Sequence, residues 1–133
     1  MLEKGLEGEF LYKVSEEMSA GHIKEVKVLS TPSMISLMEI SSHRLVQDKI
    51  PERHTTVGTR VCVSHKAPAP VGGVVRVRVK LVDVDGRKLT FRVEAYWNDV
   101  LIGEGEHERY VVNLEKFLNK IRGALGEPKG VDK

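Results

Sequence analysis

Three polar side chains stand out in this 133-residue sequence because their surroundings suit chemistry rather than solvation. Glu39 is the single charge in the apolar run MISLMEISS, and a carboxylate in such a setting must be paired, hydrogen-bonded or protonated. His65 ends the alternating segment TRVCVSH, on its apolar side. Thr31 stands at a predicted helix start, beside free N–H groups and the positive end of the helix dipole. Together they could supply a nucleophile or base, a proton carrier and a partner for an oxyanion.

Each of these residues also has a purely structural interpretation, and the residues alone leave the choice open. Glu39 could be held by a nearby arginine, and His65 could be a packing residue of its strand. Thr31 could do no more than cap the helix. A function for the three together therefore needs an independent argument.

The remaining histidines and the one cysteine give weaker signals. His107 is open to the same two interpretations, because alternation places it on the face that Gly103 and Gly105 share. We expect three histidines at the surface or in loops: His22, His43 and His54. Cys62 alternates to the face opposite His65, so we expect a packing residue there and no Cys-His nucleophile pair.

The elements that must position these groups follow from the hydrophobic periods. Residues 30–46 predict a core helix, which Ser-Thr-Pro opens and which is apolar almost all round. From residue 59 the period becomes two, and tight turns at Asp85-Gly86 and Asn98-Asp99 separate alternating strands that end near Val112. The sequence therefore predicts an antiparallel meander after the helix. Residues 8–14 predict one more strand, and residues 15–29 stay unassigned.

Two features near the end of the chain predict packing contacts. Gly103 and Gly105 lie on one face of the last strand, which suggests that the core helix approaches closely there. A second helix begins after Asn113, and its apolar stripe should pack on the fold or on a partner. We expect residues 126–133 to be a loose tail.

Composition predicts one soluble domain over residues 1–133 and excludes several functions. The formal charge of +2 comes from 21 basic and 19 acidic residues spread along the chain, so we expect no nucleic-acid or membrane partner. The start lacks the apolar run of a signal peptide, and a single cysteine forms no internal disulfide, which favours the cytoplasm. No zinc, P-loop or dinucleotide motif is present, so we expect no metal and no cofactor.

Three passages make the sequence resemble one known family. They are residues 30–39 (STPSMISLME), residues 57–65 (VGTRVCVSH), and GEHER at 105–109 followed by NLEKF at 113–117. Their order and spacing over residues 8–123 are similar to those of the bacterial fluoroacetyl-CoA thioesterase and its thioesterase-like relatives. The resemblance implies an α+β hot-dog fold, in which a curled antiparallel sheet wraps one long helix.

The resemblance also implies roles for particular residues. Thr31, Glu39 and His65 match the family's catalytic threonine, glutamate and histidine. Gly58 matches a backbone position close to the acyl group, and Arg109 matches a substrate-binding position without a firm role. Hydrolysis of an acyl-CoA thioester, with coenzyme A only as part of the substrate, is then expected. The family further implies a homodimer, or a homotetramer built from two dimers.

Two alternatives and one departure qualify this expectation. A binding module could hold an acyl-CoA or another apolar ligand without turnover. A hot-dog hydratase would carry an Asp and a nearby His at the helix start, and this sequence lacks that pattern. The fluoroacetate-specific member of the family has a lid of phenylalanines just before the helix, whereas residues 13–30 here contain no aromatic side chain. Strong selectivity for a fluorinated acyl group is therefore not expected.

Overall fold

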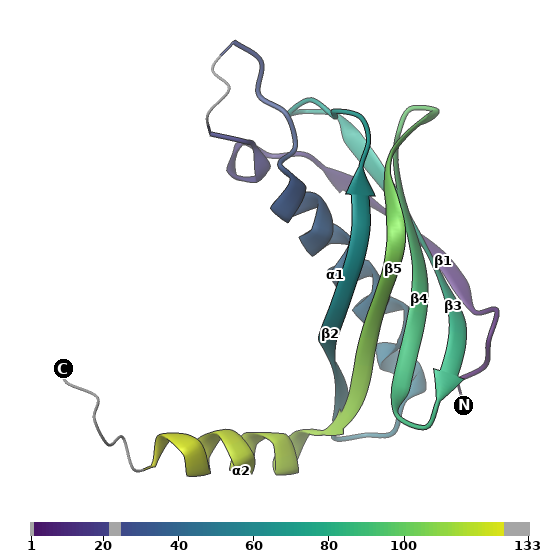
Figure 1. Ribbon diagram of the computed structural model, residues 1–133, viewed down its shortest axis with the longest axis vertical. Coiled ribbons are helices and arrows are strands. Elements are labelled where there is room, and N and C mark those ends of the chain that lie inside the picture. Colours follow the sequence, from purple (N-terminus) through teal and green to yellow (C-terminus); the bar gives the residue numbers. More distant parts are fainter. Residues whose placement is uncertain (1, 22–24, 127–133) are drawn as a thin grey trace.

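A five-stranded antiparallel sheet curls around one long helix in the computed structural model, which describes residues 2–21 and 25–126 (Figure 1). The elements in chain order are β1 (Glu7–Lys13), η1 (Glu16–Met18), α1 (Thr31–Val46), η2 (Gln47–Lys49), β2 (His54–His65), β3 (Val74–Asp85), β4 (Lys88–Trp97), β5 (Val100–Asn113) and α2 (Leu114–Leu125). No helix in the described ranges is long and apolar enough to cross a membrane.

The strand order is β1-β3-β4-β5-β2, and every neighbouring pair is antiparallel. The predicted meander is confirmed as β3-β4-β5, with the left-handed turn residues Gly86 and Asn98 at its two hairpins. The first two strands form the two edges of the sheet: β1 pairs with β3, and β2 pairs with β5. As a result β2, which carries His65, is a free edge of the sheet.

The core lies between α1 and the concave face of the sheet. Alternation places the buried residues of β3 and β4 on that face, as the sequence predicted: Val75, Val77, Val79, Leu81, Leu89, Phe91, Val93 and Ala95. Helix α1 buries Met34, Leu37 and Met38 against them. Burying a side chain of this size contributes roughly 1.5–3 kcal/mol, so the helix is anchored along its whole length.

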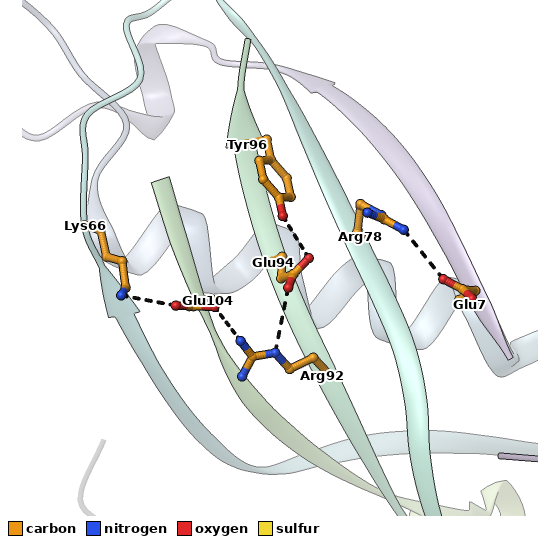
Figure 2. Close-up of polar contacts among 7 residues, drawn as sticks. All are labelled: Glu7, Lys66, Arg78, Arg92, Glu94, Tyr96 and Glu104. Atoms are coloured by element: carbon orange, nitrogen blue, oxygen red, sulfur yellow. Dashed lines mark hydrogen bonds and ion pairs between the residues drawn. The ribbon is translucent and has the colours of Figure 1, made fainter. Parts of the chain in front are cut away.

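The opposite, convex face of the sheet is covered with paired charges. Lys66 contacts Glu104 at 3.1 Å, Arg92 bridges Glu104 and Glu94, and the Tyr96 hydroxyl donates to Glu94 (Figure 2). Exposed ion pairs of this kind each contribute about 0–1 kcal/mol to stability, so their main effect is to keep this face polar and solvated.

The two glycines of β5 serve different neighbours. At Gly103 a Cβ would collide with the Met34 side chain, so the absence of one lets α1 approach the sheet, as predicted. At Gly105 the collision would be with the Cys62 carbonyl and Val63 of the adjacent strand. Only the first glycine therefore serves the helix.

Four expectations differ from the structure or lie outside it. Ser30, and not Thr31, caps α1: Ser30 is extended and its hydroxyl accepts from the Ser33 amide at 3.2 Å. Cys62 is exposed rather than packed, because its face of the edge strand has no layer over it. Helix α2 buries no residue and extends away from the sheet, so its stripe does not pack on the fold (Figure 1). The expected tail lies outside the described residues except for Gly126.

Candidate active site

The start of helix α1 and the end of strand β2 meet, and they bring Thr31 and His65 together. The Thr31 Oγ1 and the His65 Nδ1 are 2.7 Å apart, a short hydrogen bond between residues 34 positions apart in sequence. Thr31 is free to make this bond because Ser30 has taken over the capping of the helix. The two residues that we predicted to act together are thus in direct contact.

The second ring nitrogen of His65 is buried, and its polar neighbourhood is incomplete among the described residues. This nitrogen, Nε2, forms no hydrogen bond within the described part of the chain. Whichever tautomer the ring adopts, Nε2 is then an unsatisfied donor or an unsatisfied acceptor. Leaving such an atom buried costs about 1–3 kcal/mol, which proteins tolerate mainly where a ligand or a reaction uses it.

The helix start leaves one backbone donor available beside Thr31. The Ser33 amide is bound by Ser30 Oγ, Pro32 has no N–H, and the Met34 amide donates to the Ser30 carbonyl. The Thr31 amide has no acceptor among the described residues. The Thr31 hydroxyl and the Thr31 amide, at the positive end of the helix dipole, could therefore stabilise negative charge that develops on a substrate oxygen.

Glu39 lies on the same side of α1 as Thr31. Thr31, Ile35, Glu39 and His43 follow each other at i, i+4 spacing along the helix. Glu39 stands eight residues beyond Thr31, which is about 12 Å along the axis. No hydrogen bond or ion pair within residues 2–21 and 25–126 joins it to His65, and it is half-buried rather than fully buried. The reason is that the sheet covers only one side of α1.

Gly58 and Arg109 form a second group on the sheet below Glu39. They are paired across β2 and β5, next to a bulge between Gly58 and Arg60. A Cβ on Gly58 would come within 3.3 Å of an Arg109 nitrogen and 3.2 Å of the His107 ring. Arg109 is buried, and the Glu39 carboxylate opposes the lowering of its pKa that burial causes. Glu39, Gly58 and Arg109 therefore share one electrostatic environment.

Sequence reasoning placed His107 on the inner face of its strand, but it missed Thr56 and His43 behind this group. Arg109 binds Thr56 and His107, and Thr56 binds His43, so His43 is a half-buried helix residue rather than a surface one. The alternation of GEGEHER points His107 and Arg109 inward together, but it carries no signal for Thr56 or His43. His54 lies at the start of β2, and His22 falls outside the described residues.

A surface pocket lies away from this site. It lies at the other end of α1, between Ile50, Val84 and Val111, and includes neither Thr31, Glu39 nor His65. The chemistry of the side chains, and not the size of a hollow, identifies the candidate site.

Comparisons with known proteins point in one direction. The sequence profile of the family described as fluoroacetyl-CoA-specific thioesterase matches residues 14–115. The fluoroacetyl-CoA thioesterase of Streptantibioticus cattleyicolor is 40% identical over 96 residues, which are 72% of this chain and 69% of that protein.

Solved structures agree with the sequence comparison. A structure of the fluoroacetyl-CoA thioesterase FlK is 31% identical, with a TM-score of 0.85 over 92% of this chain and 97% of that one. A thioesterase superfamily member from Thermus thermophilus is 27% identical, with a TM-score of 0.84 over 94% of both chains. A hot-dog-like protein from Thermanaerovibrio acidaminovorans is 23% identical, with a TM-score of 0.83 over 91% of both chains. The predicted hot-dog fold is confirmed.

Proposed function

The chain belongs to the fluoroacetyl-CoA-specific thioesterase family, and on that premise we propose that Thr31, His65 and Glu39 carry out its reaction. The enzyme is a thioester hydrolase that converts an acyl-CoA and water to a free acid and CoA. The assignment of residues rests on the contact between Thr31 and His65, together with the buried Nε2 of His65, which forms no hydrogen bond within residues 2–21 and 25–126.

The Thr31–His65 pair handles the oxyanion and the proton. In the productive arrangement the His65 Nδ1–H donates to Thr31 Oγ1, and the Thr31 hydroxyl and amide donate to the thioester carbonyl oxygen. The lone pair of Nε2 accepts the proton that the attacking water gives up, passed on by Glu39 where the carboxylate acts as the base, and His65 then donates this proton to the sulfur of the leaving thiolate. One histidine can thus serve both proton transfers.

Glu39 supplies the attacking oxygen in one of two ways. As a base it deprotonates a water molecule, and that proton passes on to His65 Nε2. As a nucleophile it displaces the thiolate with its own oxygen and forms an anhydride, which water then hydrolyses to release the free acid and restore the carboxylate. The distance of Glu39 from Thr31 along the helix, about 12 Å between the two backbone positions, leaves room for an acyl group and a water molecule. Helix side chains lean towards the N-terminus, so the carboxylate points towards the Thr31 end. Substrate binds between the two groups in this proposal, with Gly58 and Arg109 forming the wall beneath it.

The reaction needs no metal and no cofactor in this account. A thioester requires a nucleophile, stabilisation of the oxyanion and a proton for the leaving thiolate, and the three side chains supply all of them. Coenzyme A takes part only as the thiol half of the substrate.

A short acyl group without strict fluorine selectivity is the proposed substrate. The family's name specifies fluoroacetyl-CoA, but the segment before α1 carries aliphatic cover: Leu29 is buried and Val26 is exposed. Aliphatic walls discriminate between small groups by about 1–3 kcal/mol. Acetyl-CoA and its short homologues should therefore be turned over as well.

A homodimer through strand β2 would complete the site. This 12-residue strand ends the sheet with a free edge, and an uncovered edge is a template for pairing with another chain. Ile40 of α1 is 44% exposed although the helix is apolar almost all round. Pairing of two β2 edges would cover both features and enclose Thr31 and Glu39. The paired charges of the convex face favour the dimer over a tetramer stacked through that face.

We place the enzyme in the cytoplasm. Its one thiol, Cys62, is exposed and unpaired, which suits a reducing compartment where CoA thioesters are made and used.

A panel of acyl-CoA substrates of increasing chain length tests the proposal. Because the exposed Cys62 would itself react with a thiol reagent, hydrolysis is best followed by loss of the thioester absorbance. Turnover that falls in His65→Gln but not in His54→Gln, at the other end of the same strand, supports the assignment. Equal turnover in both variants would remove His65 from the mechanism. Sedimentation of the purified protein measures the dimer directly.

A further inference from the structure

The guanidinium of Arg109 is buried and held on every nitrogen, although no carboxylate among the described residues pairs with it. Its Nε donates to Thr56 Oγ1 at 2.8 Å, and its Nη2 donates to the Thr56 carbonyl at 2.9 Å. Its Nη1 lies 3.1 Å from His107 Nε2. Three bonds to a planar group fix its position and its plane. The orientation of this cation is therefore built into the sheet.

The directions of these bonds fix the protonation state of His107. Arginine only donates, so His107 Nε2 must accept and carries no proton. The ring proton is then on Nδ1, which donates to the Arg60 carbonyl at 2.9 Å. That carbonyl follows the bulge at Gly58, and the ring stacks on Phe91. His107 is thus a neutral acceptor in a single tautomer.

The charges around His107 maintain this state. Burial lowers the pKa of His107, since the side chain is only 1% exposed, and the Arg109 cation lowers it further. The Arg60 carbonyl from β2, Glu39 from α1 and Glu108 from β5 act in the opposite direction without reversing the shift. Protonation would place two cations in contact and would replace the acceptor at Nε2 with a donor.

Arg109 faces the site, so its position matters there. Its Nη1 side and the His107 ring lie directly beneath Gly58, where even a methyl group would be crowded. The Glu39 carboxylate opposes the lowering of the pKa values of both Arg109 and His107, so its charge acts on the pair. A shift of the guanidinium would move the wall under Gly58 and the positive charge that faces Glu39.

We propose that His107 is a positioning residue of the thioesterase: as a neutral acceptor it holds Arg109 beneath Gly58 and facing Glu39. The inference rests on the proposed function, because it requires that Glu39 take part in hydrolysis. His107 does not touch substrate, and its effect on the reaction passes through Arg109. Losing its bond to Arg109 should therefore lower kcat much more than it changes KM.

Two substitutions of similar polarity separate this role from general stability. In His107→Gln the amide is long enough to offer Arg109 an acceptor, whereas in His107→Asn it reaches only the Arg60 carbonyl. We expect kcat to fall roughly tenfold or more in His107→Asn, the factor that a hydrogen bond to a charged group carries, and to stay within about threefold in His107→Gln. His54→Asn is the matched control, at a partly buried histidine at the start of β2 that does not contact Arg109.

The tautomer gives a readout that does not depend on activity. A long-range nitrogen–carbon NMR spectrum of the wild-type protein at neutral pH should show His107 protonated at Nδ1 only. A ring protonated at Nε2, or at both nitrogens, would overturn the inference even if both variants failed to fold.

The kinetic outcomes distinguish this inference from the function itself. If wild type hydrolyses acyl-CoA and loses activity in Glu39→Gln, equal kcat in His107→Asn and His107→Gln overturns the role of His107 alone. If wild type hydrolyses no acyl-CoA thioester, the proposed function fails, and with it the catalytic part of the inference. A fall in His107→Asn with recovery in His107→Gln supports it.

Discussion

The hydroxyls of the neighbouring residues Ser30 and Thr31 have different roles: the first caps helix α1 and the second contacts His65. Substituting each residue in turn should therefore separate stability from catalysis. Ser30→Ala removes the acceptor for the Ser33 amide, the bond that starts α1. Loss of an N-cap costs about 1 kcal/mol, which lowers the Tm of a domain of this size by roughly 4 °C. We expect this variant to keep most of its turnover, because its hydroxyl faces the helix.

Thr31→Val should have the opposite effect. Valine keeps the shape of threonine but breaks the 2.7 Å bond to His65 and removes the hydroxyl from the carbonyl oxygen of the substrate. Thr31 is exposed, so the free energy of unfolding should change by less than about 0.5 kcal/mol. Removing a donor to an oxyanion typically costs roughly a hundredfold or more in kcat, and that is the expected loss.

The assay combines thermal unfolding of both variants with steady-state hydrolysis of acetyl-CoA, followed by the thioester absorbance. The reasoning predicts a stable, slow Thr31→Val and a less stable, active Ser30→Ala. A Thr31→Val protein with wild-type kcat and a lowered Tm would refute it, because Thr31 would then be only part of the helix start.

Three further predictions follow from the site and its surroundings. Prolonged dialysis against EDTA should leave turnover intact, and a loss that added zinc restores would contradict metal independence. The specificity constant for fluoroacetyl-CoA should exceed that for acetyl-CoA by less than about a thousandfold, since an aliphatic pocket supplies only about 1–3 kcal/mol of discrimination; a larger ratio would show a specialised lid. Burial lowers the pKa values of His107 and His43 below 6.5, so the unfolded chain binds more protons than the folded one and stability should fall as the pH drops below about 6.5. Denaturant titrations at several pH values should show that the free energy of unfolding falls less steeply with decreasing pH in His107→Gln than in wild type. The same dependence on pH in both proteins would argue against a buried neutral imidazole at position 107.

The local patterns of the sequence predicted most of the fold. Alternation identified the buried face of β3 and β4, and Gly86 and Asn98 marked the hairpin turns, because these signals depend on neighbours in the chain. The order of the edge strands could not be read in this way. Strand β2 pairs with β5 although the paired residues are 38 (His65 and Gly103) to 59 (His54 and Asn113) positions apart, and that choice depends on the packing of the whole sheet.

The site shows the same division between local and distant signals. Glu39 and His65 were recognisable because a charge or an imidazole stood on an apolar face. The hydrogen bonds between Arg109 and Thr56 could not be recognised from the sequence, because the two residues are 53 positions apart and neither stands out in its local context. The half-exposure of Glu39 was also missed, since the sequence shows an apolar helix but not which of its sides the sheet leaves open.

The turnover of Glu39→Gln tests the central claim most directly, because Glu39 is the one group proposed to supply the attacking oxygen. The substitution keeps the size of the side chain and removes its charge, so the protein should remain folded while kcat for acetyl-CoA falls at least about a hundredfold. Glu3→Gln, at an exposed position near the start of the chain, is the control and should match wild type. A folded Glu39→Gln enzyme with near wild-type turnover would contradict the account.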